Sequence, residues 1–176
     1  MILGLDISTS ITGVTVMDKD GNCLHNDMWD TRNKKYFPNL YHKARFIKHK
    51  LLDMDDRFYI EKIYIEQSLQ SFRSGFSSAK TLSTLARFNG IISWLCVETF
   101  NIEPEMIAAS SARKKVGVVI QKGEKAKEKS FDFVVANEPT FVVEYTKNGN
   151  PKPGTLDKSD SWIIARAGFL ICNQKS

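Results

Sequence analysis

Four acidic residues stand where carboxylates could hold a divalent metal ion beside a phosphate: Asp6, Glu66, Asp157 and Asp160. Asp6 and Glu66 each end a short apolar run, so each is expected at the end of a buried strand. Asp157 and Asp160 stand three residues apart at the start of an apolar helix, and both therefore lie on one helical face. These four acids are our candidate catalytic and metal-binding residues.

Carboxylates in this arrangement suit the hydrolysis of a phosphodiester. Two Mg²⁺ or Mn²⁺ ions about 3.5 to 4 Å apart can polarise the phosphate, orient the attacking water and stabilise the leaving oxygen. Hard cations of this kind prefer carboxylate oxygens to sulfur or imidazole. We expect Asp6 to bridge both ions, Glu66 and Asp160 to hold one of them, and Asp157 to hold the other or its water. The predicted cofactor is therefore Mg²⁺ or Mn²⁺, two ions per active site, with no small-molecule cofactor.

Some of these acids also have a simpler explanation. Glu66 alone could be a surface acid at a strand end, and Asp157 alone is a good helix N-cap. Asp6 is harder to explain in this way, because it follows apolar or small residues on what reads as a central strand. An ionised side chain in such a place is costly unless it is paired or bound to a metal.

The elements that would position the acids form an α/β protein. Strands are expected over 2–6, 12–17 and 23–31, with a turn at Asp18–Asn22, then a helix opened by Pro38 and the strand that ends at Glu66. A long helix capped by Ser77 or Ser78, a short strand over 106–109, a helix capped by Ser110 or Ser111, a helix ending near Asn137 and a final helix from Asp157 follow. In the helix that ends near Asn137, the inward residues are expected to be Phe131, Val134 and Val135. This order describes a ribonuclease H-like fold: a five-stranded mixed sheet, three antiparallel strands and then parallel strands, with helices on both faces, in one domain over residues 1–176.

Positive charge is clustered along the chain, whose net charge is +5. Residues 31–50 contain seven lysines and arginines and no acid, and residues 113–129 contain seven against only Glu124 and Glu128. Such clusters are typical of proteins that bind a polyanion, because each neutralised phosphate releases condensed counterions. A solvated helix face would explain either cluster alone. Together with acids at strand ends, the distribution favours a nucleic acid as the partner.

These motifs resemble those of the RuvC family of Holliday junction resolvases, especially its phage and poxvirus branches, over nearly the whole chain. The first acidic motif is represented by Gly4–Asp6 through Thr12–Gly13, the second by Ile65–Gln67, and the terminal pair by Asp157–Asp160 leading into Ile163 and Ala165. The family's basic segment is similar to Arg113–Gly117 and Gly123–Lys127, with Val134 seven residues further on. Three acidic motifs in order together with a basic segment make the resemblance specific.

The resemblance implies a homodimer that binds a four-way DNA junction and makes two symmetric nicks by metal-dependent hydrolysis. It implies phosphate contacts from Lys114 or Lys115 and from Lys127, and the long helix after Phe76 as the better of two candidate dimer faces. Ile7–Ser8 stands where the bacterial enzymes have Pro–Gly, and Leu69 where they carry an aromatic residue at the junction centre. Phe72 or Phe76 could take that role by stacking on a base, or could pack onto the next helix. The complete set of candidate DNA-binding residues is Lys114, Lys115, Lys122, Lys125, Lys127, Phe72, Arg73, Phe76 and Lys80.

Other functions fit some of the same residues. A less selective ribonuclease H-like nuclease acting on branched DNA, flaps or hybrids would use the same metal site. A non-catalytic junction-binding module would keep the fold and the basic face. The segment Asp6–Ser10 also resembles the first phosphate loop of actin-like and sugar-kinase folds, but no second Asp-x-Gly motif follows.

The composition is that of an ordinary globular protein. No apolar stretch approaches about 18 residues and the amino terminus has no basic leader, so we expect no membrane partner and a cytoplasmic location in a prokaryotic cell or a phage-infected host. The scattered positions of Cys23, Cys96 and Cys172 predict free thiols rather than disulfides or a zinc site.

Overall fold

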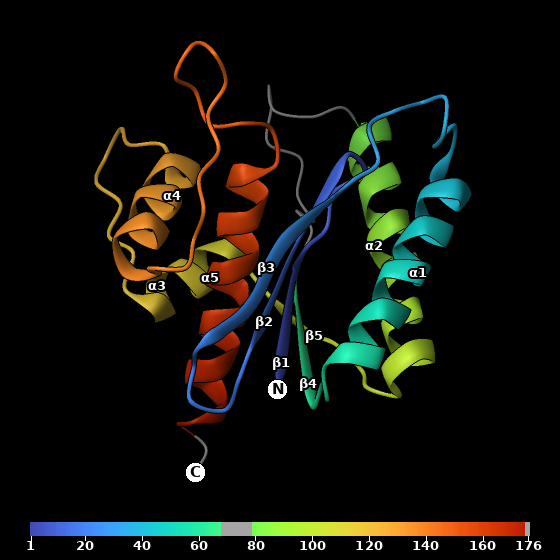
Figure 1. Cartoon of the computed structure of the whole chain (residues 1–176), viewed down its shortest axis with the longest axis horizontal. Helices are drawn as coiled ribbons and strands as arrows, with labels where there is room; N and C mark the ends of the chain where they lie inside the picture. The colour runs from blue at the N-terminus through green and yellow to red at the C-terminus, as the bar shows by residue number, and fades with distance from the viewer. Residues whose placement is uncertain (68–78, 175–176) are drawn as a thin grey trace.

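The computed structural model describes residues 1–67 and 79–174. Its centre is a five-stranded sheet with the strand order β3-β2-β1-β4-β5 (Figure 1). Strands β1, β2 and β3 pair antiparallel, β4 runs parallel to β1, and β5 runs parallel to β4. This is the predicted ribonuclease H-like sheet. Its strands are β1 (Ile2–Asp6), β2 (Ile11–Met17), β3 (Cys23–Asp30), β4 (Lys62–Glu66) and β5 (Glu105–Ile107).

The central strands divide their side chains between two apolar layers. Leu3 and Leu5 of β1 belong to the layer formed with α1 (Leu40–Arg57) and α2 (Ala79–Phe100). Ile2 of β1 belongs to the layer on the other face, formed with α5 (Thr155–Cys172). Since successive side chains of a strand point to opposite faces, Asp6 points to the same face as Ile2. The acid at the end of β1 is therefore directed toward α5.

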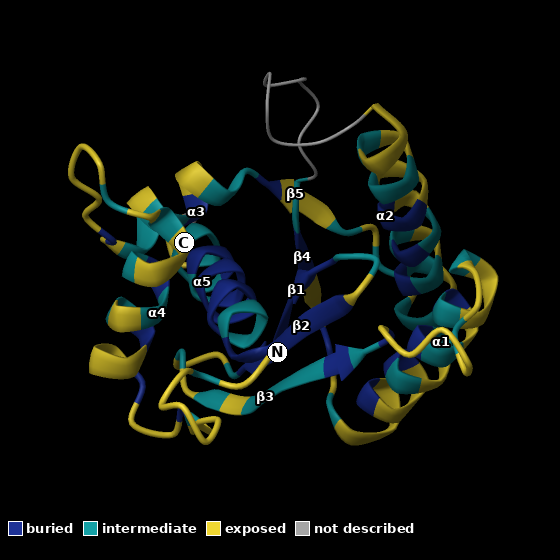
Figure 2. Ribbon diagram, turned by 90° about the horizontal axis from the view of Figure 1, so that it is seen from above, coloured by how far each residue is buried: buried dark blue, intermediate teal, exposed yellow. Residues whose placement is uncertain are grey.

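The helices cover both faces of the sheet, as predicted. Figure 1 shows α1 and α2 on one face and α5 on the other, with α3 (Ala109–Val116) and α4 (Ala126–Asn137) outside α5. Viewed from above in Figure 2, α5 is mostly dark blue, which marks buried residues, between the sheet and these two helices. A helix that is covered on several sides needs apolar residues on more than one stripe. The run Trp162–Ala165 meets this requirement, because all four of its residues are buried.

Two glycines allow α5 to lie very close to the sheet. A Cβ atom added to Gly4 would lie 2.5 Å from the backbone nitrogen of Ala165, and one added to Gly13 would lie 2.0 Å from the carbonyl oxygen of Asp157. Neither glycine is among the residues with positive φ, so the sheet needs them for clearance rather than for backbone conformation. The start of α5 therefore rests directly on β2, next to the end of β1.

Polar contacts then hold the first turns of α5 in place. The hydroxyls of Thr15 and Ser161 lie 2.8 Å apart, and the amide of Asn26 donates to the carbonyl oxygen of Lys158 at 3.0 Å. Each contact joins a residue of β2 or β3 to α5. These two hydrogen bonds, together with apolar packing, set the position of α5 along the sheet.

Several predicted helix boundaries and faces were wrong. The last helix begins at Thr155 after Gly154, whose φ is 94°, so Asp157 lies in the first turn and does not cap the helix. Helix α3 begins at Ala109 after Ala108, without a side-chain cap. In α4 the residues facing inward include Ser130 and Val134, whereas Val135 is exposed, because α4 packs on α5 along a narrow stripe. The predicted caps Ser77 and Ser78 lie outside the described residues.

The three cysteines are free thiols, as predicted. Burial raises the pKa of the Cys96 thiol to about 12, which makes it a poor nucleophile. None of the helices that the structure describes is long and apolar enough to span a lipid bilayer.

Candidate active site

Asp6 and Glu66 leave neighbouring parallel strands at the same end of the sheet. The register pairs Ile2 with Lys62 and Leu5 with Ile65, so Asp6 and Glu66 follow as the next residues on the two strands. Tyr64 packs in the layer that contains α5, and Glu66, two residues later, points to that face as well. Asp6 is 9% exposed, and Glu66 is half-buried. Both carboxylates are therefore directed toward the start of α5.

Asp157 and Asp160 lie on the first turns of α5, as the sequence predicted for a pair three residues apart. Gly13 is the register partner of Asp6, and the close approach at Gly13 is made by the backbone of Asp157. This contact brings the first turn of α5 beside the end of β1. Asp160 is 3% exposed, and Asp157 is half-buried. The helix thus presents one buried and one partly accessible carboxylate next to Asp6.

The four acids affect one another electrostatically. Burial raises the pKa of Asp6 well above its usual value, and the negative charges of Glu66, Asp160 and Asp157 raise it further. Burial also raises the pKa of Glu66, as does the charge of Asp160. The pKa of Asp157 is raised by burial and by Asp160, against the effect of Lys127. These shifts have the signature of carboxylates that share one site.

Two cations accompany the acids. Lys127, in the first turn of α4, has its Nζ atom 3.0 Å from Oδ2 of Asp160 and 3.9 Å from Oδ1 of Asp157. Burial opposes the charge on Lys127, but Asp160, Asp6 and Asp157 outweigh this effect and raise its pKa. Arg113 of α3 places Nη2 3.8 Å from Oδ1 of Asp160. The site therefore contains a bound ammonium and a guanidinium.

Arg113 is absent from our candidate residues, although it lies in the predicted basic segment. Its Nε atom donates to the hydroxyl of the buried Ser130 at 2.9 Å, which fixes the guanidinium between α3, α4 and α5. The neighbouring Lys114 is exposed. Arg113 and Lys114 differ only in which side of α3 they occupy, and this depends on where the helix begins. The predicted caps Ser110 and Ser111 place that start one or more residues too late in the chain, so the sequence did not show which of the two residues faces the acids.

The four acids have the right chemistry to bind a hard divalent cation, although their side chains are not yet close enough together to surround one. Among the described residues, no three His, Cys, Asp or Glu side chains are grouped closely enough to hold a metal ion. All four acids nevertheless supply oxygen donors, and Oδ2 of Asp160 is buried without a hydrogen-bond partner besides its ion pair with Lys127. Four carboxylates with Lys127 and Arg113 leave two negative charges uncompensated. A divalent cation would balance them.

The other candidate residues surround this end of the sheet to different degrees. Lys122 and Lys125 are exposed on and beside the loop between α3 and α4, and Lys80 lines a hollow together with residues 8–10 of the β1–β2 loop. Lys115 instead donates to Oε1 of Gln174, near the carboxyl end of the chain. Phe72, Arg73 and Phe76 lie outside the described residues. The loop between α3 and α4 also exposes the apolar side chains of Val119 and Ile120, which the sequence patterns did not single out.

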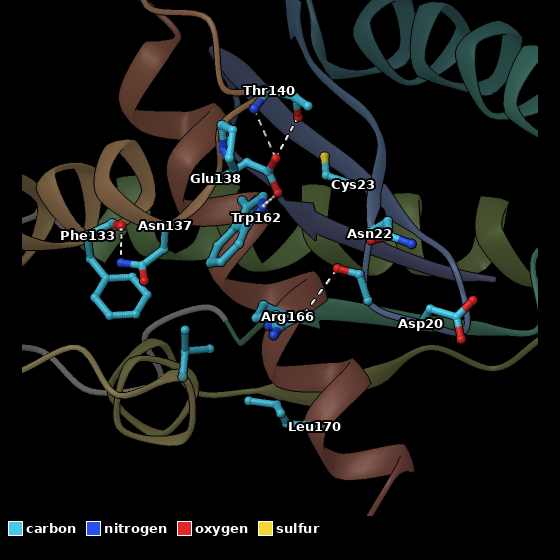
Figure 3. A pocket seen from close by; sticks show the side chains of 13 residues that line it. Asp20, Asn22, Cys23, Phe133, Asn137, Glu138, Thr140, Trp162, Arg166 and Leu170 are labelled. Carbon is cyan, nitrogen blue, oxygen red and sulfur yellow. Dashed lines mark hydrogen bonds between the residues drawn. The ribbon is translucent and has the colours of Figure 1, made fainter.

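A separate pocket of about 660 Å³ is bounded by the β2–β3 hairpin, by the segment that follows α4, and by helix α5 (Figure 3). It contains none of the four acids. Two of its charged groups are used by the fold itself: Glu138 accepts hydrogen bonds from Trp162 Nε1 at 3.0 Å and from the Thr140 hydroxyl at 2.6 Å, and Arg166 donates to the Gly21 carbonyl oxygen at 3.1 Å. We therefore assign this pocket a structural role.

Replacing Glu138 tests that structural role. Glu138→Ala is expected to reduce the free energy of unfolding by about 1 to 3 kcal/mol, because the buried Trp162 N–H loses its acceptor. Glu144→Ala removes an exposed acid that pairs with Lys152 and should change stability far less than Glu138→Ala does. Urea unfolding of both variants measures the difference, and equal effects would contradict the assignment.

Comparisons with known proteins find similarity at the level of structure. No protein-family model matches the chain, and no curated protein matches it by sequence. Among solved structures, Thermus thermophilus RuvC bound to a Holliday junction substrate matches with a TM-score of 0.67 and 14% identity, over 98% of this chain and 94% of that one. A second structure of Thermus thermophilus RuvC matches with a TM-score of 0.65 and 17% identity, over 99% and 96%. The yeast mitochondrial Holliday junction resolvase matches with a TM-score of 0.62 and 13% identity, over 99% and 84%. The chain therefore has the ribonuclease H-like fold of these junction resolvases.

Proposed function

We propose that residues 1–176 form one nuclease domain that resolves four-way DNA junctions by paired, symmetric, metal-dependent nicks. The observation that carries the proposal is the approach of Asp6 and Glu66, from adjacent parallel strands, to Asp157 and Asp160 at the start of α5. The likeness of the whole chain to resolvases, one of them bound to a junction, supports the choice of substrate. The polyanion expected from the basic clusters is then DNA.

Asp6, Glu66, Asp157 and Asp160 would hold two Mg²⁺ or Mn²⁺ ions, which when bound polarise the phosphate and activate a water molecule. The chain's own cations have other tasks. Arg113, fixed by Ser130, keeps Asp160 in position. The side chain of Lys127 is 55% exposed while its ammonium contacts Asp160, so it can turn toward an arriving phosphate and offset negative charge that develops there.

A labelled immobile four-way junction tests the proposal. The chain is incubated with the junction and Mg²⁺ or Mn²⁺, and the ends are mapped on all four strands. Paired nicks at symmetric positions are expected, and unpaired or asymmetric nicks would contradict resolution. Equal cleavage of forks, flaps, duplexes and hybrids would instead identify a less selective nuclease with the same site. Binding without cleavage would leave a non-catalytic junction-binding module.

A homodimer is part of the proposal, because paired nicks need two active sites. On α2, the side chain of Trp94 is 65% exposed, and Gly90, one turn earlier, is exposed with free space beside it. A large exposed aromatic beside a flat helix surface is typical of an interaction site. We propose that this part of α2 packs against a second copy of the chain.

Trp94→Glu is expected to raise the dimer dissociation constant by on the order of 30-fold or more, since truncation of an interface tryptophan commonly costs at least about 2 kcal/mol. Light scattering across a concentration series measures this change. Val142→Glu, at an exposed apolar residue after α4, is the matched control and should leave the dimer dissociation constant unchanged. A variant that stays as dimeric as the wild type would exclude this face.

A further inference from the structure

Most of the cations on the segment between β3 and the first half of α1 have no ion-pair partner, Arg32 with its partner Asp30 being the exception among these described residues. Residues 32–45, here named the α1-side basic segment, contain no aspartate or glutamate. Within the described part of the chain, Lys34, Lys35 and Arg45 form no ion pair, whereas Lys48, Lys62 and Lys152 each pair with a glutamate. The complete set of cations in the segment is Arg32, Lys34, Lys35, Lys43 and Arg45.

The segment begins beside the four acids. The pKa of Arg32 is raised by its hydrogen bond to Asp30 and, through space, by the charge of Asp157, so the guanidinium is within electrostatic reach of the acids. Lys43 donates to the carbonyl oxygen of Thr9, in the loop that follows Asp6. In Figure 1 the connection from β3 to α1 lies at the same end of the sheet as the start of α5, on the side opposite α3 and α4.

Local contacts hold the segment in one conformation. The carbonyl oxygen of Asn33 accepts hydrogen bonds from the backbone of Tyr36 at 3.1 Å and Phe37 at 2.9 Å, and the ring of Phe37 lies 5.1 Å from that of Phe46 on α1. The hydroxyl of Thr31 donates to the carbonyl oxygen of Ser10 at 3.1 Å. A polyanion that bound here would meet cations on an ordered backbone, which lowers the entropy cost of binding.

Two tyrosines project from the same segment. The side chain of Tyr36 is 64% exposed and that of Tyr41 is 74% exposed, although large aromatic side chains usually bury most of their surface. Exposed aromatic rings among lysines and arginines are typical of surfaces that bind nucleic acid, because the rings stack on bases while the cations contact phosphates. A solvated face of a helix has no need of such rings.

We propose that the α1-side basic segment is a second DNA-binding surface, which holds the phosphate backbone of a junction arm on the side of the active site opposite the loop between α3 and α4. Lys34, Lys35 and Arg45 bind phosphates, and Tyr41 stacks on a base that the open junction leaves accessible. This inference rests on the proposed function and adds to it the location of a second arm. The DNA then passes over the four acids with cations on both sides.

The salt dependence of binding tests the role of the cations. Binding of the labelled junction in Ca²⁺ is measured from low to moderate KCl, for the wild type, for Lys34→Ala with Lys35→Ala, and for Lys19→Ala with Lys62→Ala. The control pair removes the same charge at the opposite end of the sheet, since Lys62 is the register partner of Ile2 and Lys19 follows β2. The slope of log K against log salt should become shallower by about 1.8 for the first pair, at about 0.9 per lost phosphate contact, and should not change for the control.

The role of the ring is tested separately. Tyr41→Leu is expected to weaken junction binding about five- to tenfold, whereas Tyr41→Phe keeps the ring and should bind within about twofold of the wild type. Tyr59→Leu is the matched control, because Tyr59 is exposed but lies beyond the far end of α1, where its carbonyl oxygen accepts from the amino terminus. Circular dichroism of each variant confirms that these surface changes leave the fold intact.

The outcomes separate this inference from the proposed function. If the wild type nicks the junction but the Lys34 and Lys35 variant keeps the slope of the control, the second surface is excluded and the nuclease proposal stands. If the slope changes as expected but the wild type never nicks the junction, the surface stands and the nuclease proposal fails. If the wild type does not bind the junction in Ca²⁺, both are overturned.

Discussion

Asp6→Asn is expected to abolish nicking and, at the same time, to make the metal-free protein more stable at neutral pH. The nicking rate should fall by on the order of 10³-fold, because the central ligand of the proposed metal site is lost. The free energy of unfolding without metal should rise, because burial disfavours the ionised carboxylate of the folded wild type and a neutral amide does not carry this penalty. Asp6 is buried, and the charges of Glu66 and Asp160 oppose its ionisation. A stabilising mutation that destroys activity is the pattern expected of a site built for charge that the fold alone does not balance.

The pH dependence gives this prediction a definite sign. The pKa of Asp6 is higher in the folded protein than in the unfolded chain, where it is about 3.9. Between these two pKa values the folded state binds more protons than the unfolded state, so stability decreases as the pH rises through this window. The advantage of Asp6→Asn over the wild type should therefore be full above the folded pKa and disappear as the pH approaches about 4.

Thermal unfolding with and without metal completes the experiment. Mg²⁺, Mn²⁺ or Ca²⁺ should raise the melting temperature of the wild type, because a ligand that binds only the folded state stabilises it, and should have little effect on Asp6→Asn. Asp53→Asn, at an exposed position of α1, controls for the loss of one acid. If Asp6→Asn is less stable than the wild type at neutral pH and metal stabilises both equally, Asp6 does not belong to a metal-binding group of acids.

The sequence predicted those parts of the fold and of the candidate site in which an acidic residue stands at a definite place in a strand or helix pattern. An apolar run that ends in an acid specifies both a buried strand and the end of the sheet at which its acid emerges, and this held for the strands that end at Asp6 and Glu66. A pair of acids at helical spacing specifies one face of a helix. The register between β1 and β4 then made these local predictions meet in space.

The parts that the sequence did not predict depend on how neighbouring elements approach one another. Nothing local distinguishes Gly13, whose role is to let the backbone of Asp157 touch β2, from a glycine in any other strand. Likewise, the exposure of Val135 depends on which side of α4 packs on α5, and the place of Arg113 in the site depends on the position of Ser130. Such contacts join residues far apart in the chain, so propensity and spacing carry no information about them.

Gly13→Ala is expected to separate the two halves of the active site. The added Cβ would lie 2.0 Å from the carbonyl oxygen and 2.6 Å from the carbonyl carbon of Asp157, and these backbone atoms cannot rotate away as a flexible side chain could. The first turn of α5 must therefore move away from β2, and Asp157 and Asp160 must move with it. Overpacking of this kind typically costs about 1 to 3 kcal/mol of stability. A displacement of about 1 Å at a catalytic group can reduce the rate by about 10²-fold.

Gly90→Ala separates this steric effect from the general effect of replacing a glycine. At Gly90 of α2 the added methyl group meets no atom within 4 Å, and the substitution should stabilise the helix by up to about 1 kcal/mol. Urea unfolding and metal-induced stabilisation are measured for both variants, and junction nicking is measured for Gly13→Ala. Gly13→Ala should lose stability, its stabilisation by metal and nicking, whereas Gly90→Ala should keep its stability and its stabilisation by metal. If Gly13→Ala instead nicks at the wild-type rate, the position of α5 over β2 does not set the geometry of the acids, and Asp6 and Asp157 act in separate environments.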